Sequence, residues 1–559
     1  MYRAEHPRPQ LRREEWLNLN GEWDFEFDFS KSGLARGMSA PDAAFSQKIN
    51  LPFCPESSLS GIGYTDFINA VWYRRSVVIP DEFKGRRAIL HFGAVDYYCT
   101  VFVNGARVGD HMGGYSPFSF DITDFLKDGE NIITVYAEDD TRATDIPSGK
   151  QSHEHFSFGC YYTRTTGIWQ TVWLEFVPEN HIKSVRIATD IASQSVTLTA
   201  TLCGRSTLKA EVLYNGKRVG FGESDGSVIT VRLDELHLWE LGKGRLYELA
   251  LSFGDDRVKS YFGMREIGFD GHKFLLNGKS VFQRLVLDQG FYPDGIYTAS
   301  SDSELENDIK RSMALGFNGA RLHEKVFEER FLYHCDRLGY MVWGEYPSWG
   351  LDISKPESVY RFLPEWLDIL NRDINHPSII GWCPFNETWD YEGRRQCDDV
   401  LSLVYRVTKS VDPTRPCIDT SGNFHVITDV FDVHDYDSSG DAIRARYREL
   451  PNAIVDKFDD RQKYAREPIF ISEYGGIGFL LDSKGWGYGN IPESKEAFLA
   501  RLKDVTDAIL ENKYIFGFCY TQLTDVEQEC NGLYTYDRIC KFDPDDISAI
   551  IGSKAAIED

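Results

Sequence analysis

The sequence predicts a multidomain protein: an N-terminal β jelly-roll sandwich, an immunoglobulin-like β-sandwich and a C-terminal (β/α)8 TIM barrel. Three observations lead to this prediction. The chain has 559 residues, too many for a single hydrophobic core. Short alternating strand patterns fill its first half, and from about residue 265 helical stretches alternate with apolar runs. We expect domains at 1–178, 179–264 and 265–559.

The first two domains have the pattern of all-β units. In 1–178, Trp23, Phe25 and Phe27 alternate with acidic residues, and Asn104-Gly105 is a strong hairpin signal. Many short strands separated by turns are typical of a jelly roll. The same alternation recurs in 179–264 over a length that suits an immunoglobulin-like sandwich.

The third domain alternates predicted helices with predicted strands. Helical stretches are expected at 302–315, 328–338 and 495–511. Strands are expected at 281–287, 318–322, 341–343, 379–384, 417–419, 430–433, 469–471 and 515–520. Eight strands in alternation with helices indicate a (β/α)8 barrel, which would carry its active site at the carboxyl ends of the strands.

Two of the predicted strands stop abruptly at a glutamate. Glu387 ends the run from Trp382, and Glu473 ends the run from Pro468. At about 30 residues per βα unit, the interval between them corresponds to about three units, so both would face the mouth of one barrel. Two facing carboxylates are what glycoside hydrolysis requires.

Composition excludes several classes of function. The formal charge of −25 disfavours nucleic acid and anionic lipid, and it disfavours polyanionic substrates unless local Arg and Lys offset the field. No run of 18 apolar residues and no signal-peptide core occur, so we expect no membrane span and a cytoplasmic location. The 11 cysteines lack metal-binding spacing, and we expect neither disulfides nor a zinc site.

Several motifs, in order, resemble one enzyme family. They are Thr166-Gly-Ile-Trp169, Phe262-Gly-Met-Arg265, the His376–Trp382 segment leading into Asn386-Glu387, and Ser472-Glu-Tyr-Gly475. Together with the domain order they make the chain similar to glycoside hydrolase family 2, the family of β-galactosidases, β-glucuronidases and β-mannosidases. The resemblance covers nearly the whole chain and implies an O-glycosyl hydrolase.

The resemblance implies roles for the two glutamates. Glu387 is the general acid/base and Glu473 the nucleophile, with retention of configuration. We expect the pKa of Glu387 to be raised, in part by the charge of Glu473, so that it enters the reaction protonated. Asn386 would bind the sugar 2-hydroxyl, and Tyr436 matches a family tyrosine that donates a hydrogen bond to the nucleophile.

Further candidates for substrate binding lie at the same predicted rim. Arg321 and His323 follow the second strand, and Glu345 ends the third. Two tryptophans are expected to stack on sugar rings. The remaining candidates are His434, after the sixth strand, and Asp288 and Gln289, after the first; the tryptophans are Trp349 and Trp389.

The chain departs from the family where sugar identity is decided. The Asn-x-Lys pair that β-glucuronidases use for the substrate carboxylate is not visible in 527–536, and 160–162 replace an acidic residue of some β-galactosidases. We therefore expect an exo-acting enzyme that releases a terminal neutral sugar, with galactoside first. The alternatives are an α-L-arabinofuranosidase or β-galactofuranosidase, then a β-glucuronidase or a non-catalytic carbohydrate-binding protein.

The expected partner is a glycoside or oligosaccharide, and homo-oligomers are expected because accessory sandwiches in this architecture often mediate assembly. Some family members hold a divalent cation beside the acid, but their ligands are not recognisable here. Because a two-carboxylate mechanism needs no cofactor, we expect neither cofactor nor metal. The chain also ends with the barrel, so the later domains of the largest galactosidases are not expected.

Overall fold

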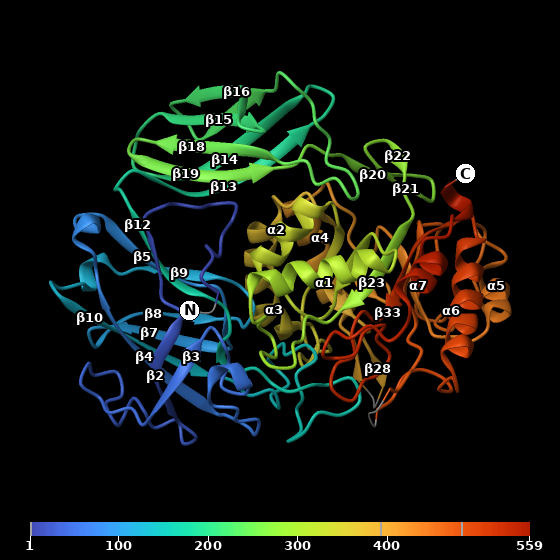
Figure 1. Cartoon of the computed structure of the whole chain (residues 1–559), viewed down its shortest axis with the longest axis horizontal. Helices are drawn as coiled ribbons and strands as arrows, with labels where there is room; N and C mark the ends of the chain where they lie inside the picture. Colours follow the sequence, from blue (N-terminus) through green and yellow to red (C-terminus); the bar gives the residue numbers. More distant parts are fainter. Residues whose placement is uncertain (1–2, 392–393, 482–484, 559) are drawn as a thin grey trace.

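The computed structural model describes residues 3–391, 394–481 and 485–558. A first sandwich (blue), a second sandwich (green) and a helix-rich barrel (yellow to red) lie side by side (Figure 1). This architecture confirms the predicted fold class. The domain boundaries stay a prediction; β12 ends at Val177, β13 begins at His181 and β19 ends at Phe262.

The first sandwich consists of two antiparallel sheets, in the orders β3-β2-β4-β10-β7-β8 and β1-β12-β5-β9, with β6 and β11 as a separate pair. Alternation drives this packing, because Trp23 and Phe25 are buried whereas Glu22 is exposed. The strands are β1 Trp16–Asn18, β2 Gly21–Phe27, β3 Gln47–Leu51, β4 Ala70–Val78, β5 Arg87–Phe92, β6 Val95–Asp96, β7 Tyr98–Val103, β8 Ala106–Met112, β9 Phe118–Asp121, β10 Glu130–Glu138, β11 Gly167–Ile168 and β12 Val172–Val177.

The second sandwich packs sheet β13-β14-β17 against sheet β16-β15-β18-β19. Its core also includes Leu11 from the N-terminal segment. The backbone of the neighbouring Arg12 pairs with that of Lys259 in β19 as an isolated antiparallel β-bridge. The strands are β13 His181–Asp190, β14 Ser195–Cys203, β15 Leu208–Tyr214, β16 Lys217–Ser224, β17 Val228–Arg232, β18 Tyr247–Phe253 and β19 Asp256–Phe262.

The barrel sheet is parallel throughout and has the order β26-β25-β24-β23-β33-β32-β31 within the described residues. Its strands are continuous apolar runs because helices cover the outer face. They are β23 Gln283–Asp288, β24 Gly319–Leu322, β25 Met341–Glu345, β26 Ile379–Cys383, β31 Phe431–Asp435, β32 Ile469–Gly475 and β33 Ile515–Thr521, and a small sheet of β20 Ile267–Asp270, β21 Lys273–Leu276 and β22 Lys279–Ser280 precedes them.

The fifth predicted strand, at 417–419, is wrong in extent. Cys417 forms only an isolated bridge with Trp382, and the strand proper is β30, Thr420–Ser421, paired with β27, Phe385–Asn386. The side chain of Asp419 accepts hydrogen bonds from two backbone N–H groups of the loop that follows, at 2.6 and 3.0 Å. Such local bonds compete with a strand ladder.

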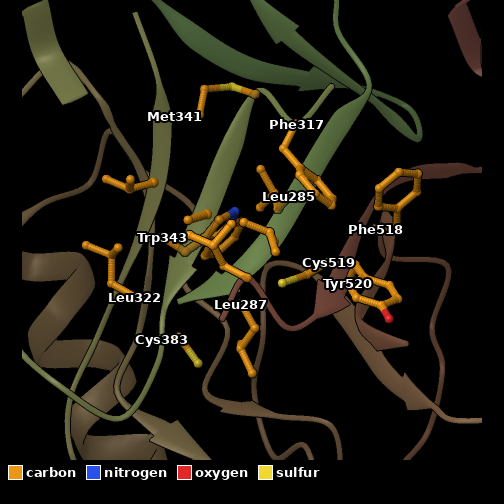
Figure 2. Packing of buried hydrophobic residues seen from close by; sticks show 14 of the residues in the cluster. Leu285, Leu287, Phe317, Leu322, Met341, Trp343, Cys383, Phe518, Cys519 and Tyr520 are labelled. Carbon is orange, nitrogen blue, oxygen red and sulfur yellow. The ribbon is translucent and has the colours of Figure 1, made fainter. Parts of the chain in front are cut away.

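Helices surround the barrel sheet (Figure 1). They are α1 Asp302–Ala314, α2 Glu329–Leu338, α3 Val359–Asp373, α4 Asp398–Val411, α5 Gly440–Tyr447, α6 Lys495–Leu510 and α7 Pro544–Ile551, and a short hairpin joins β28 Asp390–Tyr391 to β29 Arg394–Arg395. The three predicted helices are confirmed to within a residue as α1, α2 and α6. Figure 2 shows Leu285 of β23, Trp343 of β25 and Cys519 of β33 in one buried cluster.

No helix among the described residues is long and apolar enough to cross a membrane. All cysteines lie in described segments, and none of them forms a disulfide there.

Candidate active site

Glu473 lies at the end of β32, and both oxygens of its carboxylate are bound by other side chains. The Arg321 Nη1 donates to Glu473 Oε1 at 3.2 Å, and the Tyr436 hydroxyl donates to Oε2. The Glu473 side chain is 5% exposed. A carboxylate fixed at both oxygens has one orientation, with the permanent charge of a guanidinium beside it.

Arg321 of β24 joins several strand ends. It is 1% exposed, and its Nε donates to Glu345 Oε1 of β25 at 2.6 Å, while Nη1 also donates to the Ser472 carbonyl at 2.7 Å. The Nδ1 of His323 lies 3.1 Å from the other oxygen of Glu345. Burial raises the pKa of Glu345, but the charge of Arg321, together with His323 and the Glu324 N–H, outweighs it and keeps the carboxyl ionised. The structure therefore brings these three predicted residues together beneath Glu473.

Glu387 follows β27 in a different setting. Its φ is +42°, a left-handed conformation that is uncommon outside glycine, and its backbone N–H donates to the Ser421 carbonyl at 2.9 Å. The side chain is 34% exposed, and its Oε1 lies 2.7 Å from His434 Nδ1. A carboxylate oxygen of Glu387, a carboxylate oxygen of Glu473 and a ring nitrogen of His434 all lie within 4.8 Å of one another.

The expected raised pKa of Glu387 is wrong for this state of the protein. Burial raises that pKa, but the hydrogen bond and positive charge of His434 outweigh it and lower the pKa to about 2. Reciprocally, burial lowers the pKa of His434 while the two glutamates raise it above its ordinary value. The two groups share a proton that resides on the imidazole.

Asn386 presents an unused donor to this site. Its Oδ1 accepts from Arg321 Nη2 at 3.3 Å, whereas its buried Nδ2 has no hydrogen-bond partner among the described residues. An oriented amide with a free N–H is suited to a sugar hydroxyl. Tyr436 is held in turn by stacking on Tyr488, with the ring centroids 3.7 Å apart.

A cavity of about 450 Å³ opens beside Glu387, and it is lined by both the barrel and the first domain. Trp349 and Trp389, the predicted sugar platforms, are half-buried in its wall. The Trp349 Nε1 donates to the Asn386 carbonyl at 3.0 Å, which fixes the ring beside Glu387. The opposite wall includes Arg142, His153 and Tyr161 of the first domain.

Two predicted residues behave differently from the others. Asp288 accepts a hydrogen bond from the Gly290 N–H at 2.9 Å. The charged groups that most influence its pKa are Asp308, Arg538 and Lys325, and neither Glu387 nor Glu473 is among them. It caps its own turn, because a short carboxylate bonds readily to the backbone two residues on. Gln289 instead reaches the first domain, where its Nε2 donates to the Tyr162 hydroxyl at 3.0 Å.

Sequence patterns missed three charged residues near the site. Glu324, buried at φ +48°, accepts hydrogen bonds from the Ser348 hydroxyl and the Trp349 N–H. Glu529, in the loop after β33, accepts from Asn531 Nδ2 at 2.9 Å and from the Tyr162 hydroxyl. Lys150 belongs to the first domain, and its Nζ lies against the ring of Trp349. None of the three ends a strand, so the strand-end rule does not select them. Only Glu324 has a local sequence signal for the site, because it directly follows the predicted residue His323.

The cluster of Glu387, His434 and Glu473 contains donor atoms close enough to hold a metal ion. The 2.7 Å contact between the imidazole and Glu387 accounts for this proximity without one. Chemically, two carboxylates within 4.8 Å fit a nucleophile and an acid/base on one sugar.

Two family models match the chain. Residues 63–174 match "Glycosyl hydrolases family 2, sugar binding domain", and residues 270–485 match "Glycosyl hydrolases family 2, TIM barrel domain".

Similar proteins carry two different enzyme names. A putative β-glucuronidase of Formosa agariphila is 28% identical over 71% of this chain and 50% of its own length. A β-galactosidase of Thermoanaerobacter pseudethanolicus is 28% identical over 72% and 54%. The chain thus spans about half the length of these relatives. A solved β-glucuronidase of an uncultured Clostridium species has a TM-score of 0.81 at 21% identity, covering 97% of this chain and 99% of its own, which is a likeness of fold.

Proposed function

The chain belongs to glycoside hydrolase family 2, and on that premise we propose that it is a retaining exo-β-glycosidase acting by double displacement. The observation that carries the proposal is the separation of Glu387 and Glu473, whose carboxylate oxygens lie within 4.8 Å. Retaining enzymes hold the two carboxyl groups about 5–5.5 Å apart, whereas inverting enzymes need about 6.5–9.5 Å for a water between them.

In the first step Glu473 attacks the anomeric carbon while the glycosidic C–O bond breaks. Arg321 and Tyr436 hold the attacking carboxylate, and the free Nδ2 of Asn386 donates to the sugar 2-hydroxyl. The leaving oxygen takes a proton from Glu387. This proton comes from His434 Nδ1 along the 2.7 Å hydrogen bond, because the imidazole holds it before substrate binds.

In the second step a water attacks the anomeric carbon of the glycosyl-enzyme and displaces Glu473. Glu387 takes the proton of that water and returns it to the pair with His434. The charge of Glu473 is consumed while the covalent bond exists and is restored when the sugar leaves, so the cycle closes.

The identity of the sugar has two candidates. The net charge of −25 and the absence of an Asn-x-Lys pair from 527–536 favour a neutral sugar, with β-galactoside first and the furanosides as alternatives. The names of several relatives favour a β-glucuronide as the second candidate. Both candidates use the same two glutamates. A cytoplasmic location and a homo-oligomer remain further proposals, and light scattering on the purified protein tests the assembly.

A panel of aryl glycosides tests the reaction. It contains β-galactopyranoside, β-glucopyranoside, β-mannopyranoside, β-glucuronide, α-L-arabinofuranoside and β-galactofuranoside, with Glu473→Gln as the matched control. We expect one dominant sugar, released first with the anomeric configuration of its substrate by NMR and lost in the control. Release of the inverted anomer, or activity that survives in the control, would contradict the proposal.

A further inference from the structure

The first domain carries a buried cation into the candidate site. Lys150 is 5% exposed, and its Nζ lies 3.7 Å from the centroid of the Trp349 ring. Among the described residues, no hydrogen bond or ion pair reaches this ammonium group. The segment that carries it, 141–151, is part of the teal stretch that runs from the first sandwich toward the barrel in Figure 1.

The backbone around Lys150 is fixed against the barrel. The N–H groups of Ser148 and Gly149 both donate to the Trp349 carbonyl, at 2.7 and 3.1 Å, and the Lys150 carbonyl accepts from Tyr162 N–H at 2.8 Å. Gly149 has φ +57°, and a Cβ there would lie 2.5 Å from the Glu324 carbonyl oxygen. Glycine therefore permits the close approach that brings Lys150 to the site.

The groups that face the ammonium are acidic. Burial lowers the pKa of Lys150, but Cys160, Glu387 and Glu529 raise it above its ordinary value, so the group is charged at neutral pH. In return, burial raises the pKa of Glu529, and the Lys150 charge is the strongest influence against that rise. Glu387, Glu529 and Glu473 thus lie near enough to influence the ammonium, and none of them bonds to it.

A purely structural role does not explain this arrangement. Arg321, equally buried, shows what a structural cation does here, because it bonds directly to Glu345 and Glu473. The Lys150 side chain is largely buried, but its Nζ is not among the fully buried polar atoms without a partner, so the ammonium keeps access to solvent with the Trp349 ring on one side. Lys150 keeps its donors for a group that arrives from outside, and lysine suits a compact anion.

We propose that Lys150 binds the carboxylate of the substrate's terminal sugar, which decides between the two candidate sugars above in favour of the second, a uronide. This inference rests on the proposed glycosidase function and names the substrate of that same site. It also supplies the local cation that a chain of charge −25 needs for an acidic substrate. The cation thus comes from the first domain and not from 527–536, after the last barrel strand, where the resemblance placed the Asn-x-Lys pair.

The first test compares selectivity. The ratio of kcat/KM on aryl β-D-glucuronide or β-D-galacturonide to kcat/KM on the matching neutral glycoside is measured for wild type, Lys150→Met and Lys127→Met. Lys127 is an exposed lysine of the same domain and is the matched control. We expect Lys150→Met to lower the ratio about 30-fold or more, as for loss of a buried charge partner, and Lys127→Met to preserve it. An equal loss on acidic and neutral sugars would overturn the proposal in favour of a counter-ion for the glutamates.

The second test separates binding from turnover. Calorimetry measures binding of D-glucuronate, D-galacturonate and the two neutral sugars to Glu473→Gln protein, with and without Lys150→Met. We expect the acidic sugar to bind more tightly, and this preference to disappear with Lys150. Such a preference would support the inference even if no glycoside were hydrolysed, in which case only the proposed reaction would fail. Tighter binding of a neutral sugar, or an acid preference that survives Lys150→Met, would overturn it.

Discussion

The ends of β32 and β27 present the same functional group in opposite surroundings. Glu473 has a side chain that is 5% exposed and bound at both oxygens, one of them by the permanently charged Arg321. Glu387 is 34% exposed, adopts a left-handed φ, and bonds to a titratable histidine. The first carboxylate is held in one orientation and one charge state. The second is joined to a group that can gain or lose a proton near neutral pH.

This difference matches the two tasks of a retaining mechanism. A nucleophile must be ionised and aimed, and it gains from rigid donors at both oxygens. An acid/base must change protonation twice per turnover, and it gains from a partner that stores the proton. The surroundings, and not the residue type, therefore assign the roles proposed for the two glutamates.

The largest expected effect breaks the comparison directly. Glu473→Gln should lower kcat about 10⁴-fold or more whatever the leaving group, because no covalent intermediate forms without the nucleophile. Glu387→Gln should lower kcat/KM, which reports the first step, about 10²–10⁴-fold with a poor leaving group and far less with dinitrophenolate, which needs no proton. Stopped-flow and steady-state rates over a series of leaving groups measure both. If the two variants responded alike across the series, the assignment of separate roles would fail.

The second prediction concerns the rigid side alone. Arg321→Met leaves Glu345 and Glu473 buried without their cation, and breaking a buried ion pair costs about 3–5 kcal/mol. We expect a comparable loss in the free energy of unfolding, measured by denaturant titration, together with loss of activity. Arg36→Met, which removes a half-exposed arginine paired with Asp28, is the control and should cost about 1 kcal/mol or less. A small effect at Arg321 would mean that the brace beneath Glu473 is dispensable.

The sequence sufficed for the strand-end part of this site. Continuous apolar runs that end at Glu387 and Glu473 identify buried parallel strands, and the barrel topology then brings their ends together. Arg321, His323 and Glu345 were found by the same rule. The rule fails where a short polar side chain bonds to its own backbone, as Asp288 does and as Asp419 does in place of a longer fifth strand.

Lys150 shows what the sequence could not reveal. It lies on an irregular segment of another domain, and its position depends on contacts with the barrel such as Ser148 N–H to the Trp349 carbonyl. No period or turn signal in the segment specifies that contact, which joins residues far apart in the chain. The same holds for the protonation of Glu387, which is set by His434 across the barrel mouth rather than by its neighbours in sequence.

The smallest expected effect is the pH dependence of stability and activity that the pair of Glu387 and His434 produces. The pKa of His434 is raised above 6.5, so its contribution to stability is complete below that value and is lost as pH rises through the folded pKa. The pKa of Glu387 is lowered from 4.5 to about 2, so its contribution is present above 4.5 and is lost as pH falls toward 2. The pair therefore stabilises the fold most between pH 4.5 and 6.5.

His434→Gln should accordingly lower the melting temperature more at pH 5.5 than at pH 9, with Gln preserving a hydrogen bond but no charge. In catalysis, the alkaline limb of kcat/KM should move to lower pH, because Glu387 alone must then hold the proton that the imidazole held before. His153→Gln, at the wall of the cavity and without a contact to either glutamate among the described residues, is the control. An alkaline limb that stays in place would mean that the proton does not come from His434, and the two carboxylates would then differ in rigidity but not in their supply of protons.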